Sequence, residues 1–117
     1  MSIQFKYEQS EKHTDGRIEV FANKASIGYL VSYPAEPKLL NWLPCDGNYD
    51  AKFQFRKEET FMEVIGELRR YKNEKGFDYL TIWSYNDGFA AQLGKGMLNR
   101  AGFLNIPGNN PACMFLA

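Results

Sequence analysis

The chain has 117 residues, a length that suits one domain with a single hydrophobic core. Hydrophobic residues make up 44% of it and charged residues 24%, which excludes an intrinsically disordered chain. Fourteen basic and fourteen acidic residues cancel, so the composition argues against a dedicated nucleic-acid or membrane-surface protein. No stretch has the length and apolarity of a membrane span, and the first residues lack the apolar core of a signal peptide. We therefore expect residues 1–117 to form one cytoplasmic domain.

The first third of the chain predicts β-structure. Residues 3–7 alternate apolar and polar side chains, which is typical of a half-buried strand. Residues 17–22 and 26–33 have the composition of two further strands, and the short link between them predicts a hairpin. Pro34 and Pro37 are expected to end the second strand of this hairpin, because proline has no amide hydrogen for a ladder.

Residues 34–50 are the least regular part of the chain. Residues 38–43 fit a short helix or a strand equally well. Asp46-Gly47 predicts a turn within the loop that follows. Residues 51–56 alternate again and predict a strand that leads directly into the next helix.

The stretch that follows residue 60 is the most regular one. Thr60 and Glu63 have the spacing of a capping box, which predicts that the helix begins at Thr60. The apolar side chains that recur at helical spacing are Phe61, Val64, Ile65, Leu68 and Tyr71. Gly76 is expected to end the helix, since glycine readily takes the left-handed conformation of a C-cap.

The last third of the chain predicts strand, helix and strand. Residues 79–85 are rich in β-branched and aromatic residues, and a turn at 86–88 separates them from a second helix over 89–101. Residues 112–116 predict a terminal strand. The complete order predicts an α+β fold, with a mixed, mainly antiparallel sheet and two main helices.

Three short motifs share a family pattern. They are Ile27-Gly28 in the predicted hairpin, Asn86 after the strand at 79–85, and Gly102-Phe103 at the close of the last helix. With the order of elements, they make residues 17–116 resemble the GNAT superfamily of acetyl-CoA-dependent N-acyltransferases. Its members typically run hairpin, strand, acyl-CoA-binding helix, strand, helix, strand. The resemblance implies a GNAT-like fold, acetyl-CoA as cofactor and transfer of an acyl group to an amine.

The phosphate-binding loop departs from this pattern. The family holds the CoA pyrophosphate with a Q/R-x-x-G-x-G/A loop, in which glycines let backbone amides approach the phosphates. The corresponding residues 55–61 contain no glycine and include two carboxylates, for which Arg56 and Lys57 compensate in part. Leu98 stands where the family often has a tyrosine that donates a proton to the departing thiolate. These departures favour the fold over the activity.

By resemblance, the site lies where the strands at 51–56 and 79–85 separate at their C-terminal ends. The residues that the resemblance implies for acetyl-CoA binding are Phe55, Arg56, Lys57, Thr60 and Asn86.

The candidate catalytic residues are Glu58, Glu59 and Tyr85. A carboxylate, or a water molecule that it holds, would take the proton from the amine of a small molecule or a protein. A plainer interpretation is that Glu58 and Glu59 stabilise the start of the helix electrostatically. Asn86-Asp87-Gly88 is then an ordinary turn.

A second hypothesis is a GNAT-fold binding module without catalysis. Trp42 and Tyr49 lie in the irregular 34–50 segment, where an exposed aromatic surface would contact another macromolecule. His13 is the only histidine, and Cys45 and Cys113 fit no zinc spacing, so we predict no metal site.

Overall fold

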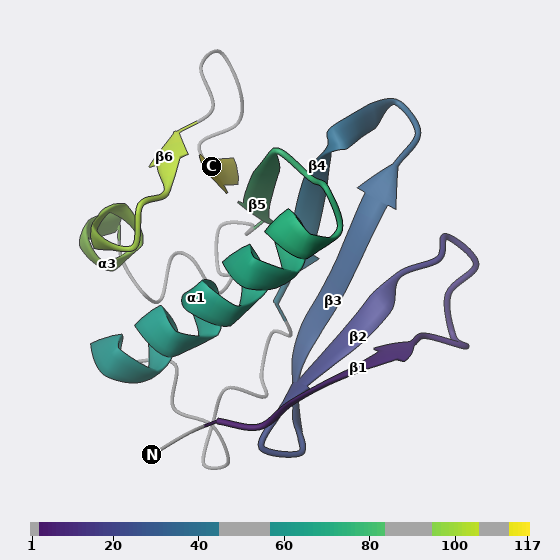
Figure 1. The fold of residues 1–117 in the computed structure, drawn as a ribbon, viewed down its shortest axis with the longest axis horizontal. Helices are drawn as coiled ribbons and strands as arrows, with labels where there is room; N and C mark the ends of the chain where they lie inside the picture. The colour runs from purple at the N-terminus through teal and green to yellow at the C-terminus, as the bar shows by residue number, and fades with distance from the viewer. Residues whose placement is uncertain (1–2, 45–56, 84–94, 106–112) are drawn as a thin grey trace.

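The computed structural model describes residues 3–44, 57–83, 95–105 and 113–117 (Figure 1). These residues form the helices α1 (Glu58–Glu74) and α3 (Lys95–Arg100) together with a single sheet. The strands are β1 (Phe5–Gln9), β2 (Ile18–Ala22), β3 (Ala25–Tyr33), β4 (Glu36–Leu43), β5 (Tyr79–Trp83), β6 (Leu104–Asn105) and β7 (Cys113–Leu116). The predicted α+β class is confirmed.

The order of strands in the sheet is β1-β2-β3-β4-β5-β7-β6. Among the described strands, only β4 and β5 are parallel neighbours, and every other neighbouring pair is antiparallel. The chain passes from β4 to β5 through α1, which lies across one face of the sheet (Figure 1). The predicted mixed, mainly antiparallel sheet is therefore confirmed, and its one parallel pair is built around α1.

The apolar stripe of α1 forms the centre of the core. Phe61, Val64, Ile65 and Leu68 are all buried against the sheet, as their helical spacing predicts. Burial of each such side chain contributes about 1.5–3 kcal/mol to folding. The partners of the stripe in the sheet are Val20, Ala22, Leu30, Leu40, Trp42, Leu80 and Ile82. This packing fixes the direction of α1 relative to β4 and β5.

Residues 38–43, which fitted a helix or a strand equally well, belong to β4. Pro37 was expected to end a strand, yet it is the second residue of β4. Pairing of β4 with β5 begins at Leu39, so Pro37 has only β3 beside it and costs the β4–β5 ladder no hydrogen bond. The predicted end of the hairpin strand is confirmed, because β3 stops at Tyr33, directly before Pro34, while Pro37 belongs to the strand that follows.

The neighbours of β5 in the sheet are β4 and β7, whereas the sequence predicted residues 51–56 beside it. These residues lie outside the described part of the chain, but both edges of β5 are already paired. Leu80 lies opposite Leu40 of β4 on one side and opposite Leu116 of β7 on the other. The parallel neighbour of β5 is therefore β4, which precedes α1 by a longer connection than the sequence pattern indicates.

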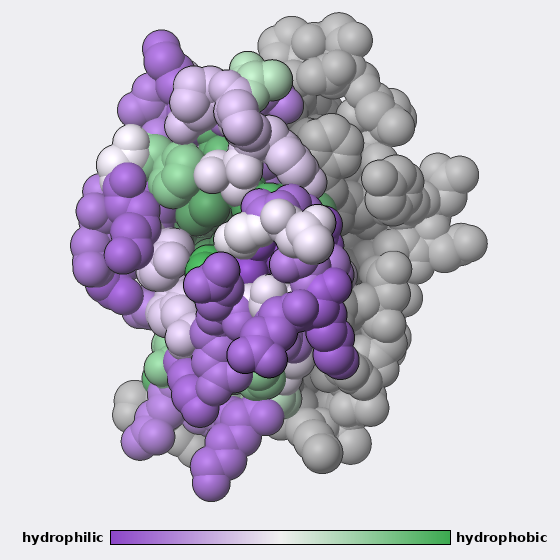
Figure 2. All heavy atoms as spheres, turned by 90° about the vertical axis from the view of Figure 1, so that its right-hand side faces the viewer, coloured by the Kyte–Doolittle hydropathy of each residue, from purple (hydrophilic) through white to green (hydrophobic). Residues whose placement is uncertain are grey.

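The first strand is attached to α1 by two tyrosines. The rings of Tyr7 and Tyr71 are stacked with their centroids 4.4 Å apart, and the Tyr7 hydroxyl donates to Glu67 Oε2 over 2.8 Å. Burial and the nearby Glu67 carboxylate raise the pKa of Tyr7 above its ordinary value. Figure 2 shows this side of the molecule, where most of the coloured surface is hydrophilic and smaller hydrophobic areas lie between.

We expect this attachment to weaken in alkali. A pKa raised by folding means that the folded state keeps the Tyr7 proton while the unfolded state loses it above pH 10, the ordinary value. Stability from Tyr7 is thus complete below pH 10 and falls as the pH rises above it. Tyr7→Phe should reduce this alkaline loss, and at neutral pH it should cost about 1 kcal/mol for the hydrogen bond. Urea unfolding of Tyr7→Phe, Glu67→Gln and the double variant measures the coupling, and additive effects would contradict the account.

Candidate functional site

The β4–α1–β5 unit brings three chain segments to one end of the sheet. Leu39 to Trp42 pair in parallel with Tyr79 to Ile82, so β4 and β5 end side by side. In the chain, α1 follows β4 and precedes β5, and it runs along the sheet in the direction opposite to these two strands (Figure 1). It therefore begins near the ends where β4 and β5 stop. In open α/β sheets, this arrangement of strand ends and a helix N-terminus is the usual place for a ligand.

The first turn of α1 begins earlier than predicted. Its N-cap residue is Lys57, and within the described part of the chain no side-chain capping hydrogen bond forms there. Thr60 lies inside the first turn, while Glu63 Oε2 accepts a hydrogen bond from the amide of Ile3 over 2.8 Å. The predicted capping box is therefore wrong. Glu58 in the first turn favours the earlier start, because a carboxylate there opposes the positive end of the helix dipole.

An ion pair joins the start of α1 to the end of α3. The guanidinium of Arg100 donates from Nε to Glu58 Oε1 over 2.7 Å, and its terminal nitrogen lies 2.6 Å from the same oxygen. Both side chains are about half exposed, so the pair contributes at most about 1 kcal/mol. The contact engages one carboxylate oxygen of Glu58 and partly offsets its negative charge.

The structure describes some of the remaining candidate residues and not others. Lys57 and Glu59 are exposed at the start of α1, and Thr60 is half-buried beside them. Lys57, Glu58, Glu59 and Thr60 are thus brought together, as consecutive residues of one helical turn. The candidates Phe55, Arg56, Tyr49, Tyr85 and Asn86 lie outside the described residues.

Trp42 is a core residue, so its predicted role in an exposed contact surface is wrong. Its side chain is completely buried, and its indole Nε1 donates to the carbonyl of Ile27 over 2.9 Å. The error has a physical cause: Trp42 was taken as part of a loop, whereas in β4 it alternates with Asn41 and faces α1.

Sequence analysis missed a buried polar pair on the outer face, which we define as the face of the sheet turned away from α1. Thr81 Oγ1 donates to Asn41 Oδ1 over 2.6 Å, and Asn41 Nδ2 donates to the carbonyl of Val31 over 3.1 Å. The pair bridges β3, β4 and β5. Its signal in the sequence is a single polar residue between apolar ones in each strand, Leu40-Asn41-Trp42 and Leu80-Thr81-Ile82. It holds the parallel strands in register close to their ends.

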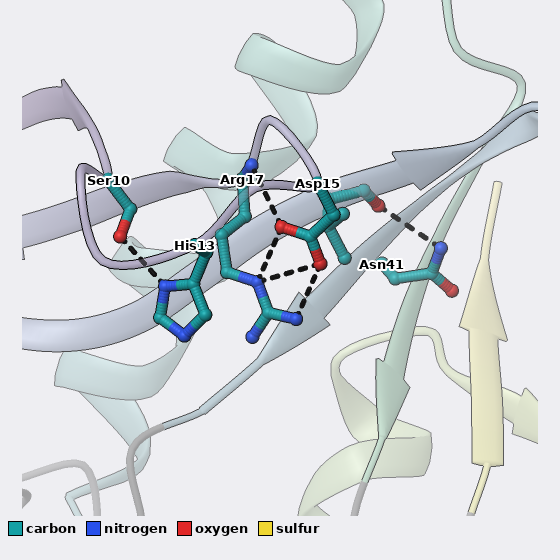
Figure 3. Close-up of polar contacts among 6 residues, drawn as sticks. Ser10, His13, Asp15, Arg17 and Asn41 are labelled. Carbon is teal, nitrogen blue, oxygen red and sulfur yellow. Dashed lines mark hydrogen bonds and ion pairs between the residues drawn. The ribbon is translucent and has the colours of Figure 1, made fainter.

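The turn between β1 and β2 is held by its own polar side chains (Figure 3). Arg17 forms a two-pronged ion pair with Asp15 and lowers the pKa of that carboxyl. The guanidinium carbon of Arg17 lies 5.7 Å from the ring centre of Tyr29, and His13 meets the same ring edge-on. His13 Nδ1 and Ser10 Oγ are 2.8 Å apart. Among the described residues no carboxylate bonds to His13, so the Ser10–His13 contact lacks the third member of a catalytic triad.

A pocket of about 620 Å³ lies elsewhere, against the first two strands. Its lining residues are Gln4, Phe5, Lys6, Glu8, Phe21, Asn23 and Lys24. Two strands, β3 and β4, separate it from β5 in the sheet. It is therefore distinct from the strand ends where the sequence predicts the site.

The described residues contain no group of three or more histidine, cysteine, aspartate or glutamate side chains placed to hold a metal ion. Within the same residues, neither helix combines the length and the apolarity needed to cross a membrane. Comparisons of the chain with protein-family models, with curated proteins and with solved structures found no match.

Proposed function

We propose that the chain is a GNAT-like N-acyltransferase-type protein, which binds acyl-CoA where β4 and β5 end and transfers the acyl group to an amine. The observation that carries this proposal is the parallel β4–β5 pair with α1 as its crossover. The order of elements also supports it. The hairpin β2–β3, then β4, α1, β5, α3 and the final strands follow the order that the resemblance implies.

The start of α1 suits one anionic group. An α-helix leaves the amides of its first turn without acceptors inside the helix, and among the described residues the side chain of the N-cap residue Lys57 does not cap them. Lys57 adds an exposed positive charge, and Arg100 offsets the negative charge of Glu58. These groups would hold part of the pyrophosphate of CoA, and Glu59 is the one described carboxylate at this turn that opposes it. The fit is electrostatic and does not depend on the missing glycines.

Acyl transfer requires a base for the amine and a proton for the departing thiolate. The thioester of acyl-CoA supplies the activated acyl group. Of the two candidate carboxylates we assign the role of base to Glu59, because Glu58 already accepts a hydrogen bond from Arg100. Glu59 would take the amine proton directly or through a water molecule. Leu98 has no proton to give and is buried in the core, so we assign this donation to the candidate catalytic residue Tyr85, which lies outside the described residues.

The second candidate is a binding module without catalysis. The engagement of Glu58 by Arg100 favours it, as does the absence of glycine between Gly47 and Gly66. Such a protein would bind a macromolecule through its surface, although Trp42 is buried and cannot contribute. Of the proposed aromatic contacts, only Tyr49 remains.

Calorimetric titration with acetyl-CoA separates these candidates. We expect micromolar binding that weakens about tenfold or more in the double variant Arg56→Ala/Lys57→Ala, because two charges near the phosphates are lost. The control is Lys12→Ala/Lys38→Ala, which removes the same charge at exposed positions far along the sheet from the start of α1. It should bind like the wild type. No heat at millimolar acetyl-CoA would reject acyl-CoA binding and leave the binding module.

A further inference from the structure

One edge of the sheet is an open strand. β1 lies at one end of the sheet order and, among the strands that the structure describes, pairs only with β2. At its start, the amide of Ile3 is covered by Glu63 of α1. From Phe5 to Gln9, the outer side of β1 has no strand beside it among the described residues. An open edge of this kind can pair with another chain.

The β1–β2 register shows which backbone groups point outward. Gln4 bonds to Asn23 and Ser10 bonds to Arg17 across the pair, at the two ends of the ladder. Because bonding alternates along an antiparallel strand, the even-numbered residues of β1 face β2. The amides and carbonyls of Phe5, Tyr7 and Gln9 therefore point to the open edge.

Charge selects the partner and the register. Lys6 and Glu8 are exposed on the same face of β1 and form an ion pair of 2.6 Å. If a second copy of β1 paired antiparallel with Phe5 opposite Tyr7, Lys6 would face Lys6 of that copy. With Tyr7 opposite Gln9, Glu8 would face Glu8. Only the register with Tyr7 opposite Tyr7 places each Lys6 opposite a Glu8, and opposite charges in this position attract.

The same register uses every outward backbone group. It places Phe5 opposite Gln9, Tyr7 opposite Tyr7 and Gln9 opposite Phe5, so all three outward residues form hydrogen-bonded pairs. We propose that the chain forms a two-fold symmetric dimer in which β1 pairs antiparallel with β1 of a second copy, centred on Tyr7. The partner is thus a second copy of this chain, and two sheets join into one. This inference is independent of acyl-CoA binding.

A charge-exchange experiment tests the dimer by sedimentation velocity from micromolar to near-millimolar concentration. The wild type should dimerise as concentration rises. Lys6→Glu and Glu8→Lys each place like charges opposite one another, so each alone should dimerise about tenfold or more weakly. An equal mixture of the two variants should form a heterodimer, because every acidic position of one strand then lies opposite a basic position of the other. The double variant Lys6→Glu/Glu8→Lys should dimerise like the wild type.

Proline provides the backbone control. Gln9→Pro removes an outward amide hydrogen but none of the bonds to β2, so it should abolish the dimer while circular dichroism and melting show an intact fold. Gln9→Ala keeps the amide and should keep the dimer. A wild type that stays monomeric at every concentration would overturn the proposal. So would a dimer that is unaffected by Gln9→Pro, or two folded charge variants whose mixture stays monomeric.

Discussion

Gly28→Ala is expected to lower the free energy of unfolding by roughly 3 kcal/mol or more. Gly28 has a φ of +114°, a conformation that residues with a side chain rarely adopt. A Cβ at this position would lie 2.2 Å from the carbonyl oxygen of Leu43 and 2.8 Å from the Cα of Pro44. Both atoms belong to the backbone, so a side-chain rotation cannot relieve the clash. β3 or the end of β4 would have to move, and the core between them and α1 would lose contacts.

The same substitution at Gly66 provides the matched control. Gly66 lies within α1, and a Cβ there would meet nothing within 4 Å. Gly66→Ala should therefore stabilise the protein by about 0.5–1 kcal/mol, since alanine favours a helix interior. Chemical denaturation of both variants measures the two effects. A Gly28→Ala variant as stable as the wild type would contradict the close approach of β3 to the end of β4.

Trp42→Ala should destabilise the fold by about 3–5 kcal/mol. The side chain is completely buried in the cluster that includes α1, and its removal also leaves the carbonyl of Ile27 without the indole donor. Trp42→Phe should cost less, because the phenyl ring fills most of the space but cannot donate a hydrogen bond.

The control for Trp42 is an aromatic side chain on the surface. Tyr33 is 39% exposed at the end of β3, and Tyr33→Ala should cost less than about 1 kcal/mol. Thermal unfolding of the three variants gives the comparison. If Trp42→Ala left stability unchanged, Trp42 would be the exposed contact residue that the sequence first indicated.

Local sequence patterns correctly predicted the helices and strands that depend only on residues close together in the chain. The stripe from Phe61 to Leu68 is buried as expected, and the hairpin at 17–22 and 26–33 corresponds to β2 and β3. The second helix agrees where it is described, over Lys95–Arg100. For α1 and the hairpin, burial of one face follows directly from the period of the apolar residues.

The neighbour of β5 could not be predicted in the same way. Its parallel partner is separated from it by α1 and a long connection, and no local period records that distance. Pro37 argued against a strand at this position, and residues 38–43 fitted a helix as well as a strand, so β4 was not predicted. The alternation at 51–56 suggested a strand closer to α1. The choice between two candidate strands depends on the register Leu40–Leu80 and on the Asn41–Thr81 bond, which are long-range contacts.

The candidate site was predicted in part. The sequence placed Lys57, Glu58, Glu59 and Thr60 together at the start of a helix, and the structure places them in its first turn and N-cap. The sequence could not predict that Arg100 would bond to Glu58, because that contact joins residues far apart in the chain. It also predicted Thr60 as the cap, since the spacing to Glu63 fits a capping box. No residue near Glu63 in the chain indicates that its carboxylate accepts a hydrogen bond from the amide of Ile3.

The most direct test of the proposed site is an amide-resolved NMR titration of the chain with acetyl-CoA. The account predicts that the largest shifts fall on the amides of Lys57 to Phe61 and on Leu43 and Trp83, where α1 begins and the two parallel strands end. Shifts centred on Lys6, Phe21 and Lys24 would instead place the ligand in the pocket beside β1 and β2, and would contradict the account. So would an unchanged spectrum at millimolar acetyl-CoA.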